Sequence, residues 1–296
     1  MNLITRGDLD GLTSSVLVTE KEEIDEVRFA HPKDMQDGKV DVFSDDIIVN
    51  LPYHENCIMW FDHHDSEVDA PKTPPDVKGK QGIAPSAARL VYEYYDDPAL
   101  ARFGELLAET DRVDSARLGM EDVLNPNRFV LLSYTLDPRS GLGAFRRYFL
   151  NLIDWLKTKK IEEIMEIPEV EGRVRMILSE QERYRQALLE TSYLDDNVVV
   201  TDFRRFDTTP AGNRFLIYTL FPQSNISARM FHGKDQGFVV VAVGHSIFNR
   251  TSKTHVGNLL AEYGGGGLRG AGTAQLPIDT ADETISKIIE RMKQDR

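Results

Sequence analysis

The chain has 296 residues and a net charge of −13 at pH 7, with 41% hydrophobic and 28% charged residues. This composition is typical of a folded globular protein, and the negative charge argues against a broad basic face for long nucleic acids. It does not exclude small phosphorylated ligands, because cations held by carboxylates attract phosphate locally.

No apolar run approaches the roughly 20 residues that a membrane-spanning helix needs. The first residues lack the basic and apolar regions of a signal peptide. Cys57 is the single cysteine of the chain, which fits a reducing compartment. Together these features predict a cytoplasmic protein that does not contact membranes.

The first hundred residues alternate short apolar runs with helical stretches, which predicts a mostly parallel sheet covered on both faces. The expected strands are Asn2–Thr5, Val27–Ala30, Ile47–Leu51 and Ile58–Phe61, with a helix at about Leu12–Glu20. A helical extension follows, with helices expected at Ala84–Tyr95, Pro98–Val113, Asn127–Leu136, Leu142–Lys157 and Val170–Ser192. The last helix is long and charged, and we expect it to connect two domains.

After Asp196 the sequence becomes rich in closely spaced apolar and β-branched segments. The expected strands are Asn197–Phe203, Arg214–Leu220, Asn225–Phe231 and Gly237–Val243, followed by a helical stretch from His255 and a closing helix at Ala281–Lys293. The sequence therefore predicts an α/β protein with a domain at residues 1–194 and a smaller α/β domain at residues 195–296.

Two aspartates, Asp8 and Asp10, lie between the first expected strand and the first expected helix. Ligands of open α/β sheets gather at the carboxyl ends of the strands, so both side chains are candidates for one pocket. The alternative is a simple helix start, with Asp10 as the N-cap and Asp8 solvated. Taken alone, the segment does not decide between these interpretations.

The segment Asp62-His63-His64-Asp65 follows the strand Ile58–Phe61, and so falls at the same edge of the predicted sheet. Adjacent histidines and aspartates supply the mixed nitrogen and oxygen ligands that suit Mn²⁺, Fe²⁺ or Zn²⁺. Further along, Asp111 or Asp114 could complete a site, although acids near a helix end are usually solvated.

Four consecutive glycines, at residues 264–267, precede Leu268 and Arg269. Glycine lets backbone N–H groups approach an anion closely, and an arginine adds a bidentate phosphate donor. The alternative is a flexible hinge. The neighbouring helix and Arg269 favour a binding loop.

In their order along the chain, these segments resemble the DHH phosphoesterase superfamily with its DHH-associated C-terminal domain. Residues 5–11 look like the first motif, residues 62–64 the name-giving third motif, Asp111 the fourth, and residues 264–272 the C-terminal glycine motif. Residues 31–38 and 50–53, together with Trp60-Phe61 before the third motif, look most like the bacterial exopolyphosphatase-like proteins.

The resemblance implies metal ligands at Asp8, Asp10, His63 and Asp111, and Mn²⁺, Mg²⁺ or Co²⁺ as one or two bound ions. It also implies catalytic roles for Asp62, His64 and Asn50, with His64 contacting the scissile phosphate or assisting proton transfer. Substrate phosphates would contact two groups of residues. They are Arg6 in the first domain, and Arg250, Gly265, Gly266, Gly267 and Arg269 in the second.

Three positions depart from the family pattern. Arg6 stands where a metal-binding histidine is usual, Asn50 where an aspartate bridges two metals, and Leu268 where the glycine motif has histidine. Arginine cannot ligate a metal, and an amide oxygen is a poor bridge between two cations. We therefore expect one strongly held ion, with a weak or substrate-dependent second.

The resemblance implies a metal-dependent hydrolase of a phosphoanhydride or phosphodiester, such as short polyphosphate, an oligonucleotide of a few residues or a cyclic dinucleotide. The alternative is a catalytically degenerate module that binds nucleotide or polyphosphate, which the three departures motivate. Retention of Asp8, Asp10 and Asp62-His63-His64 favours the enzyme. The sequence leaves homodimerisation open.

Overall fold

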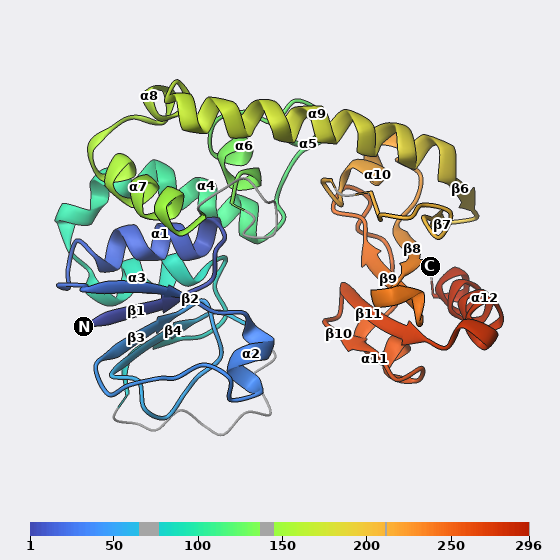
Figure 1. Cartoon of the computed structure of the whole chain (residues 1–296), viewed down its shortest axis with the longest axis horizontal. Coiled ribbons are helices and arrows are strands. Elements are labelled where there is room, and N and C mark those ends of the chain that lie inside the picture. Colours follow the sequence, from blue (N-terminus) through green and yellow to red (C-terminus); the bar gives the residue numbers. More distant parts are fainter. Residues whose placement is uncertain (65–76, 137–144, 211, 296) are drawn as a thin grey trace. The chain divides into compact units, whose positions relative to one another are not determined.

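The computed structural model describes residues 1–64, 77–136, 145–210 and 212–295, and it confirms the α/β class (Figure 1). The chain forms two compact units. The first contains Met1–Arg117 and Pro126–Arg175, and the second contains Leu118–Asn125 and Met176–Arg296. The units divide within helix α9, Pro168–Thr191, whereas the predicted domains place all of this helix in the first. The boundary at residue 194/195 stays a prediction.

The first unit is built on a parallel five-stranded sheet in the order β2-β1-β3-β4-β5. Its strands are β1 (Asn2–Thr5), β2 (Glu26–Phe29), β3 (Asp46–Val49), β4 (Met59–Asp62) and β5 (Lys78–Gln81). The first four agree with the predicted strands to within a few residues. The short, exposed edge strand β5 carries no apolar run and was not predicted.

Both faces of this sheet are buried, as predicted. Leu3, Ile47 and Phe61 belong to the large core under the helices, whereas Ile4, Ile48 and Trp60 belong to a smaller core on the other face. Because the side chains of a strand alternate between faces, each strand supplies both cores. The helices of this unit are α1 (Leu9–Val18), α2 (Pro32–Gln36), α3 (Ala87–Tyr95), α4 (Gly104–Asp114), α6 (Arg128–Tyr134), α7 (Phe145–Thr158), α8 (Ile161–Met165) and the first part of α9.

Two predicted helices differ in detail from the structure. The segment Pro98–Val113 is a 3₁₀ helix at Pro98–Phe103 followed by α4. Of the predicted helix Leu142–Lys157, residues 142–144 lie outside the described residues, and the rest lies in α7.

The second unit contains a mixed six-stranded sheet in the order β10-β11-β9-β8-β7-β6. Its strands are β6 (Ser192–Asp195), β7 (Val198–Asp202), β8 (Ile226–His232), β9 (Val239–His245), β10 (Gly266–Gly267) and β11 (Ala271–Leu276). Only β7 and β8 pair in parallel. The helices are α5 (Met120–Leu124), the rest of α9, α10 (Leu216–Leu220), α11 (Val256–Ala261) and α12 (Ile278–Gln294), with a short 3₁₀ helix at Lys234–Gln236. One core joins α11 and α12 to this sheet.

The predicted strand at Arg214–Leu220 is wrong, because residues 216–220 form helix α10. A short apolar run fits a buried strand or one buried helical turn equally well. Here three consecutive side chains, Leu216, Ile217 and Tyr218, are buried. Tyr218 also donates its hydroxyl hydrogen to the Gly244 carbonyl at 2.6 Å, a contact between segments that local sequence does not encode.

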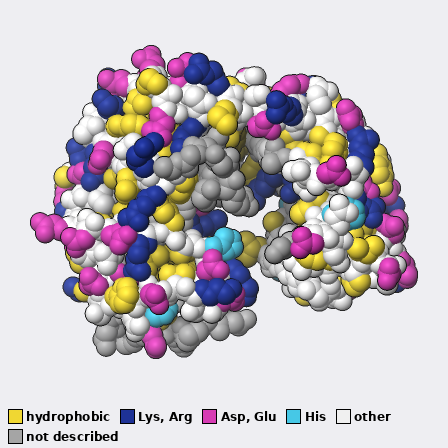
Figure 2. Space-filling model, viewed as in Figure 1, with side chains coloured by type: hydrophobic (Ala, Val, Ile, Leu, Met, Phe, Trp, Pro, Cys, Tyr) yellow, Lys and Arg dark blue, Asp and Glu magenta, His cyan; other side chains and the backbone are white. Residues whose placement is uncertain are grey.

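Among the described residues, no helix combines the length and apolarity needed to cross a bilayer. Acidic and basic side chains are interspersed over the face shown in Figure 2, without a broad basic area on that face. This distribution agrees with the net negative charge of the chain.

Candidate metal and phosphoesterase site

Three central strands of the first sheet end at one edge, and each is followed by residues of the predicted site. Asp8 follows β1, Asn50 directly follows β3, and His63 and His64 follow β4. Asn50 has a left-handed backbone with φ of 56°, a conformation that asparagine tolerates better than most residues. The parallel topology therefore brings distant segments to one place.

Asp8 is the N-cap of α1, and its Oδ1 accepts hydrogen bonds from Gly11 N at 2.9 Å and Asn50 Nδ2 at 3.0 Å. Arg6 Nε lies 3.1 Å from the other carboxylate oxygen. Burial raises the pKa of Asp8, and the charge of Arg6 partly offsets this. Both oxygens of Asp8 are thus engaged by groups of the protein.

Asp10 is fully buried and points toward the start of helix α3. Its two oxygens accept hydrogen bonds from Ala87 N at 2.9 Å and Ala88 N at 2.8 Å. The N-terminal N–H groups and the dipole of a helix stabilise such a carboxylate. Even so, burial and then the neighbouring charge of Asp114 raise the pKa of Asp10 well above its usual value.

His63 faces two carboxylates with one ring nitrogen. Its Nδ1 lies 3.1 Å from the carbonyl of Ala84, which only accepts, so Nδ1 carries the hydrogen. Its Nε2 lies 3.1 Å from Asp114 and 3.6 Å from Asp10, yet it is buried with no hydrogen-bond partner among the described residues. Burial alone would lower the pKa of His63, but Asp114 and Asp10 raise it further than burial lowers it.

These three residues can hold a metal ion. Asp10, His63 and Asp114 each offer a ligand atom, and the atoms lie within 4.8 Å of one another. When His63 is neutral, its Nε2 lone pair faces the carboxylates of Asp114 and Asp10, and a divalent ion bound by all three residues would replace the proton that these carboxylates favour on Nε2. The Nδ1 hydrogen bond fixes the ring, as in many metal-binding histidines. The residues therefore fit a divalent ion.

Asp111 has other partners. Its Oδ1 accepts from Ser86 Oγ at 2.6 Å, and its Oδ2 from Arg89 Nε at 2.9 Å and from a second Arg89 nitrogen. Asp114 lies one turn further along α4, on the same side of the helix, and it is Asp114 that approaches His63. No motif in the sequence indicates that Ser86 and Arg89 bind Asp111. The role of Asp111 as a metal ligand stays a prediction.

Asp62 and His64 form a second pair beside the metal-binding cluster. Asp62 is buried, and one of its carboxylate oxygens lies 2.7 Å from His64 Nδ1. The His64 side chain is 31% exposed, and its ring centre lies 4.5 Å from that of His63. A buried carboxylate at Nδ1 orients the imidazole and leaves Nε2 as the proton-exchanging atom.

The glycine segment is a tight hairpin in the second unit. The N–H groups of Gly265 and Leu268 donate to Leu260 O at 2.9 Å and Ala271 O at 2.8 Å, while Gly266 and Gly267 form β10. A Cβ at Gly265 or Gly267 would lie within 2.4 Å of a backbone oxygen of β11. Close packing thus explains these glycines, and their predicted anion binding is untested.

The two other predicted phosphate-binding cations, Arg250 and Arg269, are exposed side chains of the second unit. Arg250 Nε donates to the carbonyl of Ile247 at 2.9 Å. The backbone carbonyl of Arg269 accepts from Val256 N at 2.9 Å and joins the hairpin to α11. Their roles toward substrate stay predictions.

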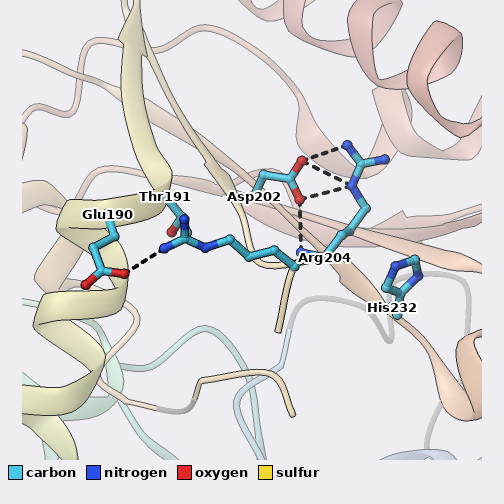
Figure 3. Close-up of a pocket in the computed structure, with 6 residues that line it drawn as sticks. Glu190, Thr191, Asp202, Arg204 and His232 are labelled. Atoms are coloured by element: carbon cyan, nitrogen blue, oxygen red, sulfur yellow. Dashed lines mark hydrogen bonds and ion pairs between the residues drawn. The ribbon is translucent and has the colours of Figure 1, made fainter. Parts of the chain in front are cut away.

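The second unit also contains a polar hollow of about 530 Å³ (Figure 3). It is lined by Glu190, Thr191, Asp202, Arg204, Arg205 and His232. Arg204 pairs with Asp202 at 2.7 Å and Arg205 with Glu190 at 2.6 Å. Both arginines are thus neutralised by carboxylates of the protein. The hollow therefore lacks the excess of negative charge found around Asp10, His63 and Asp114 in the first unit.

The fold, with carboxylates and histidines at the carboxyl edge of its parallel sheet, defines the class: the chain belongs to the DHH phosphoesterase superfamily and is a metal-dependent phosphoesterase. It is similar to the pGpG-specific phosphodiesterase PggH from Vibrio cholerae. The two are 37% identical, and the match has a TM-score of 0.85 and covers 100% of this chain and 99% of that one.

More distant structures share the fold. A DHH-domain member of the S1p family of ribosomal proteins is 15% identical with a TM-score of 0.64, over 99% of this chain and 86% of that one. RecJ from Thermus thermophilus, in complex with Mn²⁺, is 13% identical with a TM-score of 0.57, over 99% of this chain and 52% of that one. No protein-family model and no curated protein matches the sequence.

Proposed function

We propose that the protein hydrolyses a phosphodiester bond in a short linear dinucleotide such as pGpG. The observation that carries this proposal is the 37% identity to PggH over essentially the whole of both chains. Water would add across one P–O bond of the linkage and release two mononucleotides. Because the likeness covers both units, it supports a shared substrate class as well as a shared fold.

The proposed cofactor is Mn²⁺, with Mg²⁺ or Co²⁺ as alternatives, held by Asp10, His63 and Asp114. One nitrogen and several carboxylate oxygens suit these ions. When bound, such an ion polarises the phosphoryl oxygens and makes water acidic enough to act as a nucleophile near neutral pH. Asp8 and Asp111 were predicted as ligands too, and metal titration of variants tests each position.

The protein's own groups would position and protonate the substrate. His64, oriented by Asp62 at 2.7 Å, can hold or release a proton at Nε2 beside the reacting phosphate. Arg6 pairs with Asp8 through Nε, and its terminal nitrogens have no acceptor among the described residues. In the proposed complex these nitrogens would donate to a phosphoryl oxygen. Arg269, Arg250 and the glycine hairpin are the candidates for contacts with the rest of the dinucleotide.

Purified protein should convert pGpG to GMP in the presence of Mn²⁺ but not of EDTA. The panel should include cyclic di-GMP, pApA and short polyphosphate, since the sequence alone leaves these classes open. His63→Ala should abolish turnover, and Arg146→Ala, which removes an exposed ion pair with Glu26, is the control. Wild-type protein that binds Mn²⁺ and turns over polyphosphate but not pGpG would refute the proposal.

The cellular location also belongs to the proposal. Cys57 is buried and is the single cysteine of the chain, and a thiol without a partner in its own chain fits a reducing cytoplasm.

A further inference from the structure

The two aspartates that open α1 have different electrostatic environments. Asp8 contacts three donors, from Gly11, Asn50 and Arg6. Asp10 contacts two backbone N–H groups and faces His63 Nε2, which has no hydrogen-bond partner among the described residues. A permanent cation therefore already lies against Asp8, whereas Asp10 has no arginine or lysine partner among the described residues and faces the imidazole of His63.

Asn50 contributes a donor that a carboxylate could not supply. It is fully buried, and its Nδ2 donates to Asp8 Oδ1 at 3.0 Å. An aspartate in its place would put a second anionic oxygen about as close to Asp8, which is favourable only with another cation between them. Asn50 Oδ1 is buried without a hydrogen-bond partner among the described residues, so the side chain offers a cation one neutral amide oxygen, a much weaker ligand than the bridging carboxylate that a second ion would need.

Arg6 supplies a positive charge beside Asp8, where a second metal ion would otherwise be needed. Its Nε lies 3.1 Å from Asp8 Oδ2, and its side chain is 36% exposed. Asp8, together with the two carboxylates of the metal-binding cluster, Asp10 and Asp114, makes three carboxylates to be neutralised. Asp62 is not counted, because it is paired with His64. One guanidinium and one divalent ion neutralise these three carboxylates, whereas a second divalent ion would leave a net positive charge.

We infer that Arg6 and Asn50 take the place of a second metal ion, so that the protein binds one divalent cation, at Asp10, His63 and Asp114. This inference rests on the metal dependence within the proposed function, but not on the identity of the substrate. It makes Arg6 a fixed cation of the site, and a prospective contact for a phosphoryl oxygen.

Metal stoichiometry tests the inference without substrate. Mn²⁺ titration of metal-free wild-type protein by calorimetry should give one ion per chain, and its electron paramagnetic resonance spectrum should be that of an isolated Mn²⁺. The double variant Arg6→His/Asn50→Asp supplies an imidazole and a carboxylate around Asp8. It should bind two ions, with the loss of signal that spin coupling between adjacent Mn²⁺ ions produces.

Arg102→Ala, which removes an exposed arginine paired with Glu20, should bind one ion like the wild type. Thermal melts of each variant establish that it is folded. If the double variant does not fold, Arg6→Ala/Asn50→Asp replaces it. This variant removes the guanidinium beside Asp8 and should bind a second Mn²⁺ between Asp8 and the introduced carboxylate, in addition to the ion at the first site.

Two ions per wild-type chain with a coupled spectrum would overturn the inference, as would a folded variant that still binds only one. Failure to cleave pGpG would instead count against the proposed substrate and leave the stoichiometry result intact.

Discussion

The contact between Arg89 and Asp111 joins helices α3 and α4, and we predict that it positions the metal site. Arg89 donates to Asp111 Oδ2 with two nitrogens, and Ser86 donates to Oδ1 at 2.6 Å. The arginine and aspartate side chains are 28% and 13% exposed, so the pair is more buried than most surface ion pairs. Asp10 accepts a hydrogen bond from the start of α3 and Asp114 lies on α4, so we expect this contact between the two helices to hold the two ligands at their distance.

The expected loss of stability follows from the geometry. Hydrogen bonds to charged groups contribute about 1.5–3 kcal/mol, and partial exposure places this pair near the lower end. Arg89→Ala and Asp111→Asn should each lower the free energy of unfolding by about 2 kcal/mol in EDTA, measured by urea denaturation. The double variant should lose less than the sum of the two, because both remove one interaction. Arg146→Ala, at an exposed pair, should cost about 0–1 kcal/mol.

Metal affinity distinguishes positioning from direct ligation. If Asp111 is held by Arg89 and acts through α4, Arg89→Ala should weaken Mn²⁺ binding about tenfold, the lower end of the usual effect of partners that orient metal ligands. If Asp111 binds the ion itself, Arg89 competes with the ion for the Asp111 carboxylate. Removal of Arg89 should then raise the affinity for Mn²⁺. Calorimetry showing unchanged or tighter binding by Arg89→Ala, together with lost binding by Asp111→Asn, would refute the positioning role.

Three further predictions concern the same unit. A Cβ at Gly11 would lie 2.1 Å from the Arg6 carbonyl oxygen, so Gly11→Ala should destabilise the protein by more than about 2 kcal/mol in urea denaturation. In α9, a Cβ at Gly172 would meet none of the described residues beyond its own stretch of helix within 4 Å, so Gly172→Ala should be neutral or stabilise by up to about 1 kcal/mol. Burial raises the pKa of Cys57 to about 11, so only about one Cys57 thiol in a thousand is ionised at pH 8. A thiol reagent should therefore label Cys57 at the rate at which the protein unfolds. Rapid labelling of the native protein would contradict this. Mn²⁺ at about 100 times its dissociation constant should stabilise the wild-type protein by about 2.7 kcal/mol, measured as an increase in melting temperature that EDTA reverses. The melting temperature of His63→Ala should not rise with Mn²⁺. A rise in that variant would show that the ion binds at another site.

Much of the first unit was predictable because β1, β2, β3 and β4 contain short apolar runs that are followed by polar residues. Parallel strands place the ends of these runs at one edge, so Asp8 and His63 could be expected near each other from the sequence. Asn50 was expected inside a strand, and only the family resemblance pointed to it. The hydrogen-bond partners of Asp10 could not be predicted. Its hydrogen bonds come from Ala87 and Ala88, 77 and 78 positions away in the chain, and backbone N–H groups have no signature in a sequence.

The choice between Asp111 and Asp114 illustrates the limit of helical periodicity. Residues three apart lie on the same face of a helix, so both could point at His63. Packing of α4 against α3 decides, because Arg89 and Ser86 engage Asp111 and leave Asp114 beside the histidine. Such pairings depend on tertiary contacts between residues 22 and 25 positions apart, which neither spacing nor propensity specifies.

The different roles of Asp8 and Asp10 follow from the geometry of a helix start. An N-cap residue turns its carboxylate back toward the N–H groups of its own first turn, and Asp8 does so with Gly11. Asp10 already lies within α1, so its side chain leaves the helix sideways and reaches the start of α3. Two carboxylates separated by one residue are thereby directed to different neighbours. Helix geometry thus makes Asp8 an anchor within its own loop and leaves Asp10, with His63 and Asp114, to bind a cation.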